Sequence, residues 1–206
     1  MNILRRPFRY SFNWVIFYII GTTILVFLAQ NWNRYITVYI AMIPSLVLRG
    51  WVWQFVSYMF AHAGFSHIFF NMLGLFIFGV QVERQMGSKE FLLYYLVTGG
   101  IAGVISFGFY CFTGVNAILL GASGALFAVE LAFAAFYPDS IVYVMGIIPL
   151  RAPVMVLGYT ALELVFSVTG MQQGVAHLTH LSGFAVGWVY FLVRFGINPW
   201  RAFRGR

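Results

Sequence analysis

Charged residues are scarce in this chain. Asp, Glu, Lys and Arg make up 8% of its 206 residues and hydrophobic residues 62%, whereas a soluble domain carries about 25% charged residues. So few charged side chains cannot cover the surface of a soluble globule of this size. We therefore predict an integral membrane protein whose surroundings are the lipid bilayer.

Cysteine and internal basic patches are also nearly absent. Cys111 is the only cysteine, which excludes an intrachain disulfide and leaves the redox compartment undetermined. The net charge of +7 would suit nucleic acid, but the basic residues sit at the chain ends and in loops. Because no basic stripe is interleaved with stacking aromatics, we expect no nucleic-acid partner and attribute the charge to membrane orientation.

Long apolar stretches are what the sequence does contain. A transmembrane helix needs about 20 mostly apolar residues, and we predict six spans, over residues 12–30, 66–83, 91–111, 122–137, 152–170 and 178–195. The first apolar run is long and no small-residue cleavage pattern follows it, so we interpret it as a retained helix rather than a signal peptide. No repeat or linker is visible, and we expect one domain over residues 1–206.

The basic residues predict the orientation of these spans. An even number of spans places both termini on one side of the membrane. Arg34 and Arg49 would lie outside if that side is the cytoplasm, and ten of the 12 basic residues would lie inside, as the positive-inside rule favours. The inside residues are Arg5, Arg6, Arg9, Arg84, Lys89, Arg151, Arg194, Arg201, Arg204 and Arg206. We predict cytoplasmic termini.

Two segments depart from a simple row of spans. The connection over residues 31–65 is rich in Trp and Tyr, which favours a position in the membrane interface. The fourth span is short and follows the apolar stretch 111–120. Non-helical backbone at membrane depth is tolerated only inside protein or beside a wet cavity. We therefore expect a cavity next to Ser123 that opens to the outer side.

Polar side chains inside the spans are costly, so each is a functional candidate. His67 and Asn71 lie near the outer end of the second span, Ser123 at that of the fourth and His180 at that of the sixth. These ends share one side of the membrane, and the four side chains can therefore meet at one depth.

Ser123 and His180 have the chemistry of a nucleophile and its base. A serine hydroxyl needs a neighbouring base, and imidazole titrates near neutral pH. Gly183 and Gly187 on the sixth span and Gly124 on the fourth would let the two helices approach closely. The alternatives are that Gly-Ala-Ser-Gly only packs helices and that His180 makes a structural hydrogen bond.

The other polar residues receive more modest assignments. His67 and Asn71 share a helix face and could donate to an oxyanion, or could simply join helices by hydrogen bonds. We expect structural roles for His62 and His177, and neutral, hydrogen-bonded carboxyls at Glu130 and Glu163. No acidic residue is positioned beside His180, so we predict a Ser–His dyad rather than a triad.

These motifs together resemble the rhomboid family of intramembrane serine proteases. His62, His67 and Asn71, then Gly-Ala-Ser-Gly around Ser123, then Ala-His-Leu-Thr-His-Leu-Ser-Gly around His180 occur in order on the second, fourth and sixth spans. The resemblance covers nearly the whole chain. A departure is that Gln54 follows Trp53 where the family often has arginine.

The resemblance implies a fold, an activity and site residues. The fold would be an all-α membrane protein, a six-transmembrane-helix rhomboid-like bundle with a membrane-lying first loop and a mobile fifth helix. The activity would be an intramembrane serine endopeptidase that cleaves transmembrane segments of single-pass or polytopic membrane proteins. Ser123 would be the nucleophile, His180 the base, and His67, Asn71 and the Ser123 backbone N–H the oxyanion hole. We expect no cofactor or metal, and a place in a bacterial inner membrane.

Two alternative functions are weighed against this one. A catalytically silent relative that binds membrane proteins would lack the serine or the histidine, yet both are present. A histidine-based metal site could use His62, His67, His177 and His180, since imidazole suits zinc, copper or iron. No carboxylate or thiolate pairs with these histidines in the sequence.

Overall fold

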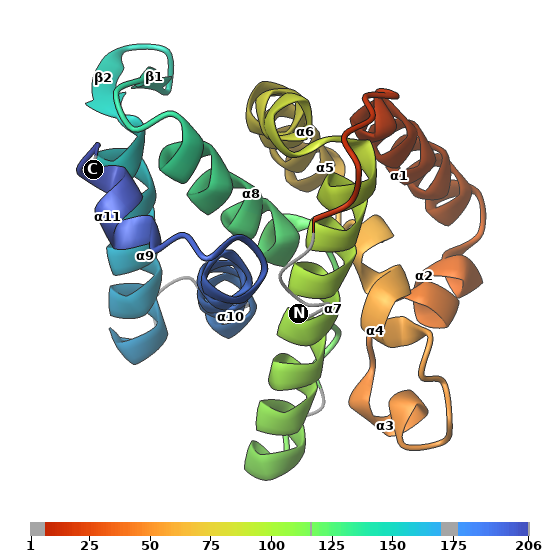
Figure 1. The fold of residues 1–206 in the computed structure, drawn as a ribbon. Helices are drawn as coiled ribbons and strands as arrows, with labels where there is room; N and C mark the ends of the chain where they lie inside the picture. Colours follow the sequence, from red (N-terminus) through yellow and green to blue (C-terminus); the bar gives the residue numbers. More distant parts are fainter. Residues whose placement is uncertain (1–6, 116, 170–176, 206) are drawn as a thin grey trace.

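The computed structural model describes residues 7–115, 117–169 and 177–205, which form a bundle of helices (Figure 1). Its long helices are α1 (Val15–Trp32), α7 (Ser88–Thr113) and α9 (Ala152–Thr169). Two further long helices contain π-helical turns: α5 (Phe65–Gly74) runs through η3 (Leu75–Gly79) into α6 (Val80–Met86), and α10 (His177–Tyr190) runs into η4 (Phe191–Phe195). The short helix α11 (Pro199–Phe203) follows.

Five of these helices are long and apolar enough to cross a membrane. They match five of the six predicted spans. The remaining predicted span is α8 (Ser123–Phe136), an apolar helix of 14 residues. At 1.5 Å per residue it is about 21 Å long, shorter than the roughly 30 Å hydrocarbon core of a bilayer. The prediction of a helical membrane bundle is confirmed, and α8 is short because it begins at Ser123.

The segment between α8 and α9 contains β-structure that was not predicted. Residues after α8 form an antiparallel hairpin of β1 (Ile141–Val144) and β2 (Ile148–Arg151). The strands are rich in β-branched residues, and the turn between them includes Met145 and Gly146 at positive φ. The hairpin is a small exception to the all-α prediction, and it leads directly into α9.

The first loop, residues 33–64, folds into short helices. These are α2 (Arg34–Ile40), α3 (Pro44–Val47), α4 (Gln54–Ser57) and the 3₁₀ turn η2 (Tyr58–Phe60). Of these, α3 and α4 lie against α7, and α2 lies against α1 and α4. The Tyr58 hydroxyl donates to the Gly99 carbonyl of α7 at 2.8 Å. Met42 pairs through its backbone with Leu119, just before α8. The loop thereby holds in place the segment that leads into Ser123.

Gln54 supplies the polar contacts that hold this loop together. Its side chain is fully buried. Its Oε1 accepts from the Ile43 backbone N–H at 3.0 Å, and its Nε2 donates to the Val38 carbonyl at 2.9 Å. Where the family often has arginine after tryptophan, an uncharged amide therefore joins α2, α3 and α4.

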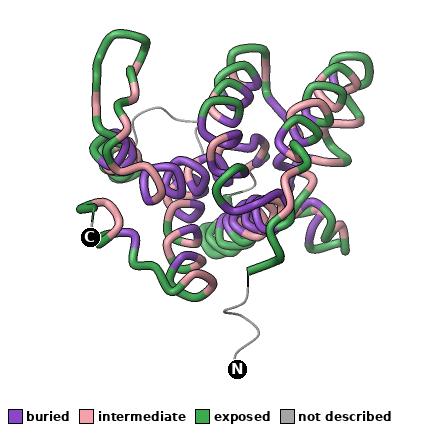
Figure 2. Tube along the Cα trace, turned by 45° about the horizontal axis from the view of Figure 1, so that its top comes forward, coloured by how far each residue is buried: buried purple, intermediate pink, exposed green. Residues whose placement is uncertain are grey.

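The helix that carries Ser123 lies in the middle of the bundle. Figure 1 shows α8 with α9 and α10 on one side and α7 on the other. Of its 14 residues, 11 are buried. Buried positions follow the inner faces of the helices and exposed positions the outer faces (Figure 2). Protein rather than lipid surrounds most of α8.

Small residues bring α8 and α10 into backbone contact. A Cβ atom added at Gly183 would lie 2.6 Å from the Gly124 carbonyl carbon, and one at Gly187 would lie 3.2 Å from the Ala128 Cα. Tyr94 on α7 donates its hydroxyl to the Ala128 carbonyl at 2.6 Å, on the same level of the bundle. The predicted close approach of the two small-residue faces is confirmed.

Buried carboxylates fix the end of the bundle opposite Ser123. Glu83 is fully buried, and its two oxygens accept from the Val15 and Ile16 backbone N–H groups at 2.7 and 3.0 Å, at the start of α1. Glu90 pairs with Arg194 at 2.7 Å. The Glu83 contacts satisfy donors at the start of α1 that would otherwise lack partners.

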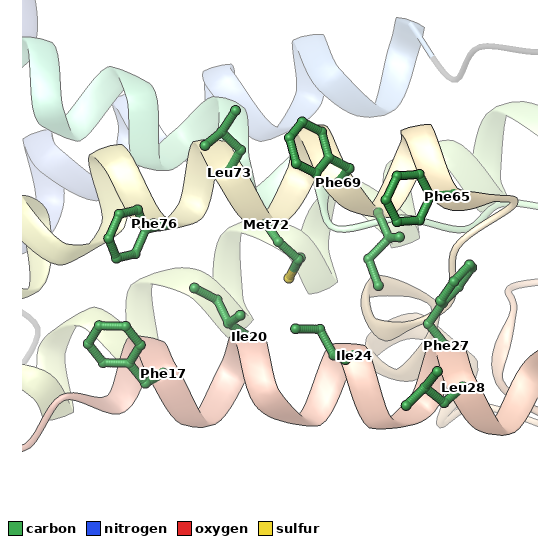
Figure 3. Close-up of a pocket in the computed structure, with 11 residues that line it drawn as sticks. Phe17, Ile20, Ile24, Phe27, Leu28, Phe65, Phe69, Met72, Leu73 and Phe76 are labelled. Atoms are coloured by element: carbon green, nitrogen blue, oxygen red, sulfur yellow. The ribbon is translucent and has the colours of Figure 1, made fainter.

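An apolar groove separates α1 from α5 and has a volume of about 500 Å³. Figure 3 shows Ile20 and Ile24 of α1 and Met72 of α5 pointing into the space between the two helices. The groove is lined by Phe17, Ile20, Ile24, Phe27, Leu28, Phe65, Ile68, Phe69, Met72, Leu73 and Phe76. His67 and Asn71 are not among its lining residues, so this groove is not part of the serine site.

Candidate active site

Two helix starts place a hydroxyl next to an imidazole. Ser123 is the first residue of α8, and His180 lies one turn into α10. The Nε2 atom of His180 is 2.6 Å from the Ser123 Oγ. Because Gly183 lies one turn beyond His180 and contacts Gly124 directly, the backbone contact and the side-chain contact depend on one another. The structure therefore brings together the nucleophile and base candidates of the sequence.

The His180 ring is held from one face by an aromatic side chain. Phe127, one turn after Ser123 on α8, stacks on the imidazole with ring centroids 4.8 Å apart and planes 9° from parallel. Stacking restrains the tilt of the imidazole. Phe127 was not among the predicted site residues, although its position four residues after Ser123 places it on the same helix face.

A carboxylate from α9 also reaches this site, which corrects the expected surroundings of His180. Glu163 Oε1 lies 3.1 Å from His180 Nδ1, and Oε2 lies 2.6 Å from His177 Nδ1. His180 Nδ1 makes no hydrogen bond within the described part of the chain, so its 3.1 Å approach to Glu163 is a close polar contact rather than a formed hydrogen bond. Our expectation that no acidic residue lies beside His180 is wrong, because neighbours along the sequence do not reveal contacts between helices.

His67 and Asn71 lie on α5, on the other side of Ser123. A Cβ atom added at Gly121 would lie 2.7 Å from His67 Nε2 and 3.8 Å from Ser123 Oγ. Gly121 has a φ of +114°, which glycine adopts readily, and this turn lets the His67 ring lie close to the serine. Asn71 is buried and donates to the His67 carbonyl of its own helix at 2.8 Å. An amide carries two N–H groups, so the second is free for another acceptor.

His62 supports this side of the site from the loop before α5. Its backbone N–H donates to Gln30 Oε1 at 3.1 Å, and its ring meets the His67 ring edge-on at 5.0 Å. Burial, with a smaller effect of the neighbouring His67, lowers the pKa of His62 from 6.5 to about 4. His62 is therefore neutral at physiological pH.

The remaining predictions for polar residues have mixed outcomes. Within residues 7–115, 117–169 and 177–205, no three His, Cys, Asp or Glu side chains are grouped so that they could hold a metal ion. Glu130 is buried on α8, two turns from Ser123, and its Oε2 has no partner in the described part of the chain. Glu163 has the hydrogen-bond partner that we expected, since its Oε2 lies 2.6 Å from His177 Nδ1, whereas the expected hydrogen bond of Glu130 stays a prediction. The cavity expected beside Ser123 stays a prediction.

Comparison with known proteins places this site in a family. The Rhomboid domain model matches residues 49–197, which include Ser123, His180 and the residues predicted to form the oxyanion hole. Rhomboid protease GlpG of Haemophilus influenzae is 31% identical over 143 residues, covering 68% of this chain and 68% of GlpG. Rhomboid protease GluP of Bacillus subtilis is 38% identical over 89 residues, covering 42% of this chain and 18% of GluP.

The relatives extend beyond bacteria. Rhomboid-like protein 11, chloroplastic, of Arabidopsis thaliana is 30% identical over 189 residues, covering 84% of this chain and 62% of that protein. The chain thus spans less than two thirds of several curated relatives that it matches. The domain model covers well over half of this chain, and the match to GlpG covers about two thirds of each of the two proteins. The chain therefore belongs to the rhomboid family.

Proposed function

We propose that this protein is an intramembrane serine endopeptidase that cleaves transmembrane segments of other membrane proteins. The observation that carries the proposal is the 2.6 Å contact between His180 Nε2 and Ser123 Oγ at the enclosed start of α8. A base in hydrogen-bond contact with a serine is the requirement for nucleophilic catalysis by a hydroxyl. The names of GlpG and GluP as rhomboid proteases support the same reading.

The reaction follows from these positions. His180 takes the proton of Ser123 as the oxygen attacks the scissile carbonyl carbon, and it then gives that proton to the leaving amine as the C–N bond breaks. Water hydrolyses the resulting ester with the same base. Three donors surround the place where negative charge develops: the side chains of His67 and Asn71 and the backbone N–H of Ser123. The last is available because the first N–H groups of a helix have no partner within it.

The substrate class follows from the depth of the site. A transmembrane helix satisfies its own backbone, so a peptide bond inside it must be exposed before a serine can attack it. We propose substrates that are single-pass or polytopic membrane proteins whose spans contain helix-breaking residues and a small side chain before the cut. Cleavage would occur near the outer ends of α5, α8 and α10.

We further propose that both termini lie on the cytoplasmic side of a bacterial inner membrane. The contacts of Glu90 support the shared side, because its Oε2 accepts from the Phe8 backbone N–H at 3.0 Å and its Oε1 contacts Arg194 at 2.7 Å. The start of the chain and the end of the last span therefore lie at the same level of the bundle. The positive-inside rule then assigns that level to the cytoplasm.

A fluorophosphonate probe and a fluorescent transmembrane substrate test the proposal on the purified full chain in proteoliposomes. We expect covalent labelling at Ser123 and cleavage of the substrate, and we expect both to disappear in Ser123→Ala. Cleavage that persists at the wild-type rate in Ser123→Ala would contradict the assignment. An unlabelled, inactive wild-type protein that still binds the substrate would instead indicate a silent membrane-protein binder.

A further inference from the structure

We propose that Glu163 is a positioning residue that orients the base His180 and stabilises its positively charged form. The inference rests on the proposed function, since it concerns the base of that reaction. It replaces the expected dyad by a chain of contacts from Ser123 through His180 to Glu163. Its starting point is the 3.1 Å distance between Glu163 Oε1 and His180 Nδ1.

The carboxylate is held in place by a second histidine. His177 and His180 lie three residues apart on α10, and both turn toward α9. His177 Nδ1 contacts Oε2 of Glu163 at 2.6 Å, which leaves Oε1 directed at His180. The Glu163 side chain is 16% exposed and that of His180 11%. This group is therefore largely shielded from bulk water. Charge interactions are stronger in such a shielded place than at an open surface.

In the proposed reaction, this carboxylate would stabilise the protonated imidazole of His180. When His180 takes the serine proton at Nε2, the imidazole becomes a cation with N–H groups on both nitrogens. A carboxylate at Nδ1 lowers the energy of that cation and favours the tautomer whose Nε2 accepts the proton. The present 3.1 Å contact is not a formed hydrogen bond, but hydrogen bonds of catalytic groups are often long or poorly aligned before substrate binds. Phe127, stacked on the ring, limits how far the imidazole can tilt.

The alternative is a purely structural role, in which Glu163 only holds α9 against α10. A helix clamp would alter stability and substrate entry, whereas a positioning residue alters the chemical step. The two therefore differ in whether a substitution lowers kcat or changes KM. They also differ in whether a shorter carboxylate restores activity.

The experiment compares Glu163→Gln, Glu163→Asp and His177→Gln with the wild-type chain in proteoliposomes. Glu130→Gln is the matched control, because it removes another buried carboxyl that makes no contact with His180. For Glu163→Gln we expect kcat to fall at least tenfold, short of the roughly 10⁴-fold loss in a well-aligned triad. KM and the melting temperature should stay near wild type, and fluorophosphonate labelling should slow by a factor similar to that for kcat.

The other variants separate the effect of the negative charge of Glu163 from that of its contact with His177. Glu163→Asp should recover part of the lost kcat because it restores the negative charge. His177→Gln should cause a smaller loss because the carboxylate loses its second contact. Glu130→Gln should retain a kcat close to that of wild type, because Glu130 lies outside the reacting groups.

Three results would overturn the inference while leaving the proposed function intact. They are wild-type kcat in Glu163→Gln, a loss confined to KM, and an equal loss in Glu163→Asp and Glu163→Gln that follows a lower melting temperature. A wild-type protein that neither cleaves nor is labelled would instead overturn the proposed function, and this inference with it.

Discussion

Replacing Gly183 by alanine should separate α10 from α8 and slow the reaction strongly without unfolding the protein. The added Cβ would lie 2.6 Å from the Gly124 carbonyl carbon and 3.1 Å from the Gly124 Cα. Carbon atoms in ordinary contact are about 3.5–4.0 Å apart. Because both partners are backbone, no side chain can rotate to make room, and the helices must move apart by about 1 Å or more.

This displacement has a calculable effect on the site. His180 lies one turn from Gly183, so a retreat of about 1 Å would lengthen the 2.6 Å contact with Ser123 beyond good hydrogen-bond distance. Misplacing a catalytic group by about 1 Å can cost on the order of 10²-fold in rate. Overpacking of this kind typically costs about 1–3 kcal/mol of stability.

The assay is cleavage of the fluorescent transmembrane substrate together with the rate of fluorophosphonate labelling. Gly158→Ala is the control, because it adds the same methyl group to α9 at a site with nothing within 4 Å. We expect Gly183→Ala to lose about 10²-fold in both assays, and Gly158→Ala to remain near wild type. Wild-type cleavage by a well-folded Gly183→Ala protein would refute the claim that this backbone contact sets the distance between the base and the serine.

Two more predictions concern the α5 side of the site. Gly121→Ala should slow cleavage, because its Cβ would lie 2.7 Å from His67 Nε2 at a φ of +114° that alanine resists; unchanged kinetics would show that His67 is free to move. His62 has a pKa of about 4 in the folded protein, below its ordinary 6.5, so the unfolded chain binds more protons between these values. The contribution of His62 to the free energy of unfolding is therefore fully present above pH 6.5. It is lost as the pH falls toward 4, and the loss is roughly 3 kcal/mol at most. The difference in melting temperature between wild type and His62→Gln should shrink as the pH falls from 6.5 to 4. A difference that stays constant over this interval would contradict the lowered pKa of His62.

Much of the fold could be predicted because lipid imposes a strong constraint on sequence. Each membrane-crossing helix needs a long apolar run, and all five long helices follow from such runs. The short α8 was also recognisable from the apolar non-helical stretch before Ser123. The hairpin after α8 was missed because two four-residue strands outside the spans leave only a weak pattern.

The site was predictable to the extent that its residues lie on small-residue helix faces. The glycines at 124, 183 and 187 indicated that two particular helices touch, and that contact brings Ser123 to His180. Nothing comparable indicated that α9 would turn Glu163 toward His180. A carboxyl inside an apolar span always requires a partner, but the sequence does not say which of several histidines provides it.

The enclosure of α8 has a consequence for how the protein responds to its host membrane. When bilayer thickness changes, helices with lipid on their surface adjust by tilting or by local deformation of the bilayer. Neighbouring helices screen α8 on most sides, since 11 of its 14 residues are buried. Hydrophobic mismatch therefore acts on the outer helices, while the height of the serine is fixed by its protein neighbours. The position of the cut along a bound segment should thus be the same in thin and thick bilayers.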